Sequence, residues 1–155
     1  MGQIAKRDNP QTVIGAFRQK LTPLDALNLK EGETAVALHM VRDPGNLGTI
    51  LRTADSVGAD GVLLVGPSCD PFSVEAVRGS MGSIFAVKLA RASFDELLEY
   101  KNARGAQIIG ASLKGAPVGA EAPAPARMIL LMGNEQSGLP PAMEAACDVL
   151  ARIPM

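Results

Sequence analysis

The sequence predicts an α/β fold in which helices cover both faces of a parallel, doubly wound sheet. Short, nearly continuous apolar runs alternate with amphipathic segments along most of the chain. Such runs are typical of strands buried on both faces, and the alternation of strands with helices is typical of a parallel sheet. The 155 residues, 47% of them hydrophobic, are enough for one well-buried core and too few for two ordinary domains.

Five apolar runs are the predicted strands, because each is short and mostly continuous. They cover residues 34–41, 61–66, 85–90, 106–112 and 128–133. The final stretch, "VLARIPM", is predicted to be a further apolar strand that a proline stops. Ligands of such a sheet bind outside the carboxyl ends of its strands.

Four segments between these runs are the predicted helices. They cover residues 47–57, about 73–79, 93–104 and 140–146. In the first helix, apolar residues recur at spacings of three and four and so form one core-facing stripe. Its members are Leu47, Ile50, Leu51, Ala54 and Val57. A loop of Pro44, Gly45, Asn46 and Gly48 is expected to lead into this helix.

Two segments depart from the alternation. Residues 114–127, "KGAPVGAEAPAPAR", are rich in Ala, Pro and Gly and predict a long exposed loop. Residues 1–33 contain one apolar run, at 12–17, followed by a turn-rich stretch, and are expected to form an arm or linker. The predicted domain therefore covers residues 34–155.

Composition excludes several classes of function. Fifteen basic and sixteen acidic residues give a net charge of −1, so any contact with RNA must be local or shared with a partner chain. Aromatic residues make up only 3%, which argues against a base-stacking platform. After the first strand, "PGNLG" matches neither the dinucleotide-binding nor the P-loop fingerprint.

The few chemically reactive side chains favour a reduced, soluble, cytoplasmic protein without a metal. Cys69 and Cys147 belong to no Cys-x-x-Cys pair and predict two free thiols. The single histidine, His39, lies near the end of an apolar run and is expected to be a packing residue rather than a zinc ligand. No signal peptide or membrane-spanning run is present in the sequence.

Three stretches contain candidate functional residues: two begin near the end of a predicted strand, and the third, "VLARIPM", is the end of the sequence. In "DPGNLGTILRTAD", Arg52 is the only cation among small and hydroxyl residues, and its simplest alternative role is an exposed pair with Asp55. In "LLMGNEQSGLPP", a buried strand ends at Gly133 and Glu135 follows, although such a loop can also merely cap the next helix. We expect Asn46, Arg52 and Glu135 to gather at one carboxyl edge of the sheet.

Together with the terminal "VLARIPM", these stretches resemble, in order, the three motifs of the SpoU class of the SPOUT RNA methyltransferases. The resemblance spans residues 35–155. It implies a homodimer that transfers a methyl group from S-adenosylmethionine to a ribose 2′-hydroxyl of tRNA or rRNA. It also implies a carboxyl-terminal trefoil knot that holds the cofactor.

Carried over by motif, the resemblance implies a role for individual residues. Asn46 and Arg52 match the first motif, in which Arg52 is the catalytic arginine. Gly133, Asn134 and Glu135 match the second, with Glu135 near the active site, and Asn46 and Glu135 join Arg52 as implied catalytic residues. The implied cofactor-binding residues are Gly133, Ile153, Met155, Leu131, Met132 and Ala111. An arginine normally stays protonated, so Arg52 is better suited to hold a phosphate and stabilise charge on the reacting oxygen than to act as a base.

Two departures from the family pattern are also expected to matter. The third motif stops at Met155, before the family's final helix, and "KRDNPQTVIGAFRQK" is similar to the end of a substrate-binding domain. The chain is therefore expected to be truncated at both ends, with an incomplete knot and a cofactor pocket that lacks one wall. The alternative function is a non-catalytic RNA-binding or dimerisation module.

Overall fold

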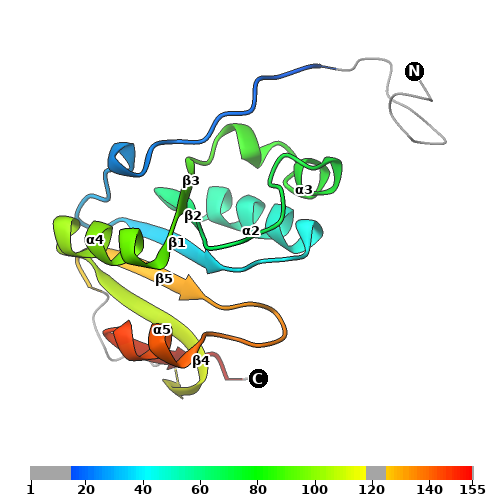
Figure 1. Cartoon of the computed structure of the whole chain (residues 1–155). Coiled ribbons are helices and arrows are strands. Elements are labelled where there is room, and N and C mark those ends of the chain that lie inside the picture. Colours follow the sequence, from blue (N-terminus) through cyan, green and yellow to red (C-terminus); the bar gives the residue numbers. More distant parts are fainter. Residues whose placement is uncertain (1–14, 118–124, 155) are drawn as a thin grey trace.

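Among the residues that the structure describes, six parallel strands form one sheet in the order β3-β2-β1-β5-β4-β6 (Figure 1). The structure is a computed structural model that describes residues 15–117 and 125–154. The strands are β1 (Thr34–His39), β2 (Gly61–Val65), β3 (Leu89–Ala92), β4 (Gln107–Pro117), β5 (Met128–Met132) and β6 (Val149–Arg152). The predicted α/β fold with a parallel sheet is confirmed.

The chain builds this sheet outward in two directions. From β1 it moves through β2 to β3, and it then places β4, β5 and β6 on the other side of β1. Strand β5 lies between β1 and β4 and pairs with both, through Leu131 opposite Ala37 and Gly110. The direction of winding therefore reverses between β1 and β5, where α/β proteins form their ligand-binding crevice.

Helices cover both faces of the sheet. They are α2 (Pro44–Ser56), α3 (Val74–Gly79), α4 (Phe94–Arg104) and α5 (Pro141–Ala146), with short 3₁₀ turns η1 (Leu24–Ala26) and η2 (Ser83–Phe85). Helix α2 packs on one face and α4 and α5 pack on the other. Helices α2 and α3 lie side by side (Figure 1). All four predicted helices are present.

Alternate residues of each central strand supply the two cores. In β1, Ala35 and Ala37 pack on the side of α4 and α5, whereas Val36 and Leu38 pack on the side of α2. This is the period-2 geometry of a strand buried on both faces. It explains why these strands appear in the sequence as continuous apolar runs.

The predicted strand 85–90 is displaced in the structure. The strand β3 begins only at Leu89, because Gly82 takes a left-handed conformation (φ 102°) and Ser83–Phe85 form the turn η2. Ile84 and Val87 pack against the α2-side core instead of pairing in the sheet. The apolar character of this run reflects packing of a turn, which the run alone does not distinguish from a strand.

The loop expected before the first helix is also helical. Asp43 caps α2, and Pro44 occupies its first turn, where a fixed φ favours the helix. Gly48 lies inside the helix because α3 comes close, so that a Cβ at Gly48 would lie 2.6 Å from the carbonyl oxygen of Ala76. The glycine therefore reflects a close approach of two helices rather than a loop.

The start of the predicted loop 114–127 belongs to β4. This strand bends between Ala111 and Ala116 and then continues beside β6 as far as Pro117. The bend brings Gly115 so close to the backbone of β6 that a Cβ there would lie 2.6 Å from the amide nitrogen of Ala151. Residues 118–124 of the predicted loop lie outside the described residues.

Part of the predicted amino-terminal arm packs on the domain. Leu27 and Leu29 are fully buried in the core beneath α4, and Arg104 donates a hydrogen bond to the carbonyl of Asp25. Within residues 15–117 and 125–154, no helix is long and apolar enough to cross a membrane. The boundary between residues 33 and 34 stays a prediction.

Candidate active site

A cavity of about 260 Å³ lies where the sheet reverses its direction of winding, at the carboxyl ends of β1 and β5. Its apolar wall comes from β1 and the residues after it, from α2 and from the end of β5. Its polar side chains belong to Asn46, Thr49 and Glu135. The lining residues are Leu38, Val41, Asn46, Thr49, Ile50, Met132, Gly133 and Glu135. Residues from two of the candidate sequence stretches therefore meet in one place.

The first turn of α2 is held in place from its amino end. The carboxylate of Asp43 accepts a hydrogen bond from the backbone N–H of Asn46 at 2.6 Å, which satisfies one of the free donors of the helix terminus. On the next turn, the Thr49 hydroxyl donates to the carbonyl of Gly45. The side chains of Asn46 and Thr49 consequently leave a rigid helix and line the cavity.

The loop after β5 is closed by Asn134. Its backbone pairs with Gly138 in both directions, and its side-chain Oδ1 accepts hydrogen bonds from the N–H groups of Gln136 (3.0 Å) and Ser137 (3.2 Å). This is the Asx turn that an asparagine followed by polar residues and a glycine favours. The loop leaves no space at Gly133, where a Cβ would overlap the carbonyl of Gly138.

Asn134 also connects this loop to β1. Its Nδ2 donates to the carbonyl of Met40 at 2.9 Å and to the carboxylate of Glu135 at 3.0 Å. Met40 takes a left-handed backbone conformation (φ 52°), which is uncommon for a residue other than glycine. One side chain therefore fixes a strained residue after β1 and orients the acidic residue after β5.

Glu135 is the single charged side chain among the lining residues. Close by, burial raises the pKa of the Cys69 thiol, and the negative charges of Glu135 and Asp43 raise it further. Cys69 is consequently a neutral thiol and a poor nucleophile. Both Cys69 and Cys147 are free, as predicted.

His39 lies at the end of β1 and is 9% exposed. Burial lowers the pKa of its imidazole. It belongs to the face that α4 and α5 cover, because it shares the parity of Ala35 and Ala37 along the strand. The prediction of a packing residue at the strand end is confirmed.

Arg52 lies outside the cavity. It follows Asn46 by six residues, roughly 9 Å along the axis of α2, and it is exposed on the helix surface. No ion pair joins it to Asp55 or to any other described residue. The structure thus brings Asn46 and Glu135 together as expected but leaves Arg52 at a separate place on α2.

The implied cofactor-binding residues fall into three groups. Met132 and Gly133 line the cavity. The side chain of Leu131 is fully buried in the core on the opposite face of the sheet, and its implied role in cofactor binding stays a prediction. Ala111 is half-buried on β4, and Ile153 is 70% exposed just after β6. Met155 lies outside the described residues.

A hydrogen-bonded network of three polar side chains fixes the bend of β4 beyond Ala111. Glu144 of α5 accepts hydrogen bonds from the Ser112 hydroxyl and the Lys114 ammonium, both at 2.7 Å. The hydrogen bond from Lys114, which has the larger effect, and the hydrogen bond from Ser112 hold the pKa of the Glu144 carboxyl below its ordinary value of 4.5. The network attaches β4, the strand that contains the implied cofactor residue Ala111, to α5, the helix that follows the Asn134 loop.

This network predicts a loss of stability in acid. Because the pKa of Glu144 is lowered by folding, its contribution is complete above pH 4.5 and is lost as the pH falls through the lower, folded-state value. Thermal melts at about pH 7 and about pH 3 should therefore show a smaller acid-induced decrease in the midpoint for Glu144→Gln than for the unchanged chain. Glu99→Gln, at an exposed position of α4, is the control. Equal decreases in all three proteins would contradict the role of Glu144.

Sequence reasoning places Asn134 in the second motif but assigns it no role, whereas in the structure its side chain organises the site. The signal was present, because an asparagine before polar residues and a glycine favours an Asx turn. It also missed the apolar wall of Leu38, Val41 and Ile50, which was assigned to the core. No local signal separates a wall residue from a core residue, since both are apolar and buried.

The fold and the site define a class of protein. A doubly wound sheet with a small cavity at its switch point, lined by an amide and a carboxylate, is a site for a small ligand at the carboxyl edge. The model of the SpoU rRNA Methylase family matches residues 33–155, and the chain belongs to this family. The family resemblance seen in the sequence is confirmed.

Solved structures and curated proteins that are similar to this chain support the same family. An AdoMet-bound rRNA methyltransferase from Sinorhizobium meliloti is 48% identical, with a TM-score of 0.93 over 99% of this chain and 59% of its own. A 23S rRNA (uridine(2479)-2′-O)-methyltransferase from Streptomyces viridochromogenes is 30% identical over 97% of this chain and 54% of its own length. The Bacillus subtilis 23S rRNA (guanosine(2553)-2′-O)-methyltransferase RlmP is 30% identical over 82% of this chain and 51% of its own length. The chain thus spans about half the length of these curated relatives.

Proposed function

We propose that this chain transfers a methyl group from S-adenosylmethionine to a ribose 2′-hydroxyl of tRNA or rRNA. The main support is the meeting of Asn46, Gly133 and Glu135, from two distant motifs, in one cavity at the switch point. The names of its relatives add the chemistry, since they include 2′-O-methyltransferases of 23S rRNA and an AdoMet-bound enzyme.

The cavity suits the reacting end of the cofactor. The sulfur that carries the transferable methyl group is positively charged, and no lining residue is a cation, whereas Glu135 is an anion. Its volume of about 260 Å³ lies below the roughly 300 to 1,000 Å³ of sites for whole small molecules. We assign the remainder of the cofactor to Ala111 on β4, to Ile153 just after β6 and to Met155.

The chain's own residues orient the ribose and exclude water. The bound cofactor would supply a methyl group on a sulfonium: the ribose 2′-oxygen bonds to the methyl carbon, the sulfur keeps the electron pair of the broken carbon–sulfur bond, and the hydroxyl proton passes to the adjacent phosphate. The amide of Asn46 and the carboxylate of Glu135 supply hydrogen-bonding groups for the sugar hydroxyls. Leu38, Val41 and Ile50 form an apolar wall that excludes competing water. No metal is required in this scheme.

Arg52 is assigned to the phosphate beside the target ribose. Its guanidinium presents paired donors that suit a phosphate and stabilise charge that develops on the attacking oxygen. Because Arg52 lies outside the cavity of its own protomer, we propose a two-fold homodimer in which it approaches the cavity of the other copy.

The free thiols are consistent with the proposed cytoplasmic location. The state of the knot and the truncation stay predictions.

The test is transfer of a tritiated methyl group from S-adenosylmethionine, at millimolar concentration, to unmodified transcripts of tRNA and 23S rRNA. The expected result is label at one nucleotide whose phosphodiester resists cleavage by alkali. The bond resists because a methylated 2′-oxygen cannot attack the neighbouring phosphate. Label on a base would contradict ribose methylation. Cofactor binding in a calorimeter without any transfer of label would favour the non-catalytic RNA-binding or dimerisation module.

A further inference from the structure

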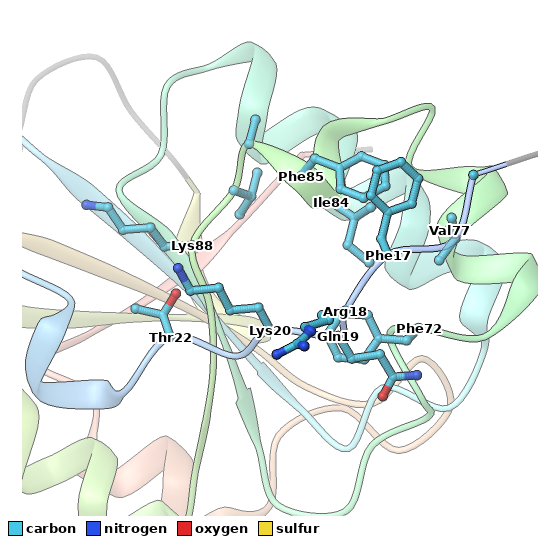
Figure 2. Close-up of a pocket in the computed structure, with 13 residues that line it drawn as sticks. Phe17, Arg18, Gln19, Lys20, Thr22, Phe72, Val77, Ile84, Phe85 and Lys88 are labelled. Carbon is cyan, nitrogen blue, oxygen red and sulfur yellow. The ribbon is translucent and has the colours of Figure 1, made fainter.

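A second, larger cavity of about 610 Å³ lies where residues 15–22 pass α3, η2 and the start of β3 (Figure 2). It shares no lining residue with the candidate active site. The backbone N–H of Thr22 donates to the carbonyl of Leu89 at 2.7 Å, which fastens this amino-terminal segment to the edge strand β3. The cavity is therefore a feature of the described fold, separate from the proposed chemistry.

Aromatic side chains gather at this cavity. The chain has four phenylalanines, and three of them, Phe17, Phe72 and Phe85, line it. The rings of Phe17 and Phe85 lie 4.8 Å apart between centroids and are tilted by 54°. Both side chains remain largely exposed, at 71% and 65%. A low aromatic content of 3% thus hides a local concentration of exposed rings.

Positive charge gathers at the same cavity. Its lining includes Arg18, Lys20 and Lys88 and contains no acidic side chain. Lys88 forms an ion pair with Asp60 at 2.6 Å, whereas Arg18 and Lys20 form none with any described residue. In Figure 2 the side chains of Lys20 and Lys88 lie on the side of the cavity opposite the Phe17 and Phe85 rings. A chain with a net charge of −1 thus carries a local cationic site.

We propose that this cavity binds an unpaired nucleotide of RNA, with its phosphate at Arg18 and Lys20 and its base against Phe85. Proteins that bind single-stranded nucleic acids combine exposed aromatic rings, on which bases stack, with cationic side chains that contact phosphates. The absence of an acidic side chain from the lining disfavours a basic peptide. The cavity volume lies within the usual range for sites that enclose a small ligand.

The proposal rests on the proposed function only for the identity of the RNA, a tRNA or rRNA substrate. Because the two cavities share no residue, the second cavity holds a nucleotide other than the one that is methylated. It anchors the substrate, and its loss is expected to weaken RNA binding without changing the affinity for S-adenosylmethionine.

The experiment measures binding of fluorescein-labelled oligouridylate by fluorescence anisotropy to the full chain. Phe85→Leu keeps an apolar side chain but removes the ring, and it should weaken binding by roughly tenfold. Met81→Ala, at an exposed apolar position outside the lining, is its control. A difference of less than twofold between these two variants would overturn the proposal.

The charge is tested by the dependence of binding on salt. Each phosphate contact with a single strand contributes about 0.7 to the slope of log affinity against log salt concentration. The double variant Arg18→Gln, Lys20→Gln should therefore reduce this slope by about 1.4, whereas Lys30→Gln, exposed elsewhere, should leave it unchanged. Equal effects of the two variants, or no binding of the probe by the unchanged chain, would overturn the proposal.

Calorimetry with S-adenosylmethionine separates the two proposals. Cofactor affinity should be the same for the unchanged chain and for the cavity variants. Because the cofactor pocket is expected to lack one wall, the titration extends to millimolar cofactor, and failure of the unchanged chain to bind it there would count against the proposed methyl transfer. The anisotropy results would still decide the nucleotide site, because that measurement contains no cofactor.

Discussion

Arg52→Ala should lower the rate of methyl transfer by roughly 10²- to 10³-fold, the usual effect of removing a group that stabilises transition-state charge. Cofactor affinity should remain nearly unchanged, because Arg52 is assigned to the RNA phosphate, whereas Met132 and Gly133 line the cavity assigned to the cofactor. The substitution should also leave stability intact, since the side chain is exposed and has no ion-pair partner among the described residues. Single-turnover label transfer and calorimetry measure the two effects separately.

Two variants sharpen this test. Arg52→Lys keeps the charge but loses the planar pair of donors, so it should restore only part of the rate. Asp55→Asn, one helical turn away, should retain the full rate, because no ion pair joins Asp55 to Arg52. A large fall in cofactor affinity in Arg52→Ala would show that the arginine serves the cofactor and not the phosphate.

Gly133→Ala should abolish detectable cofactor binding and destabilise the fold by about 1–3 kcal/mol, the usual cost of overpacking. A Cβ at this position would overlap the carbonyl of Gly138 and the amide nitrogen of Leu139. The backbone must therefore shift, which opens the turn that Asn134 closes and displaces Glu135. Chemical denaturation and calorimetry measure the two losses.

Gly138→Ala is the matched control in the same loop. A Cβ there meets no atom within 4 Å, although its φ of 67° is unfavourable for a side chain. It should cost about 1–2 kcal/mol, the penalty for a left-handed residue, and retain cofactor binding. If both alanine variants bind the cofactor as the unchanged chain does, Gly133 does not shape the cofactor site.

Local patterns predicted most of the elements. The runs at 34–41, 61–66, 106–112 and 128–133 contain or begin strands, and all four helices occur close to the expected residues. The failures at 85–90 and at 44–48 have one cause, because a short apolar run or a glycine-containing turn suits more than one backbone conformation. Contacts from elsewhere decided between them: Ile84 and Val87 pack against the α2-side core, and Gly48 lies against α3.

The sequence by itself determined the fold class, the family and the motifs that carry Asn46, Arg52 and Glu135, because side-chain periodicity and motif spacing are recorded along the chain. Only the tertiary structure decided that β5 lies between β1 and β4, which places Asn46 and Glu135 in one cavity and leaves Arg52 outside it. It also brought Phe17, Phe72 and Phe85 together at the second cavity. Strand order and contacts between distant segments arise from packing of the whole chain, and no local stretch of residues specifies them.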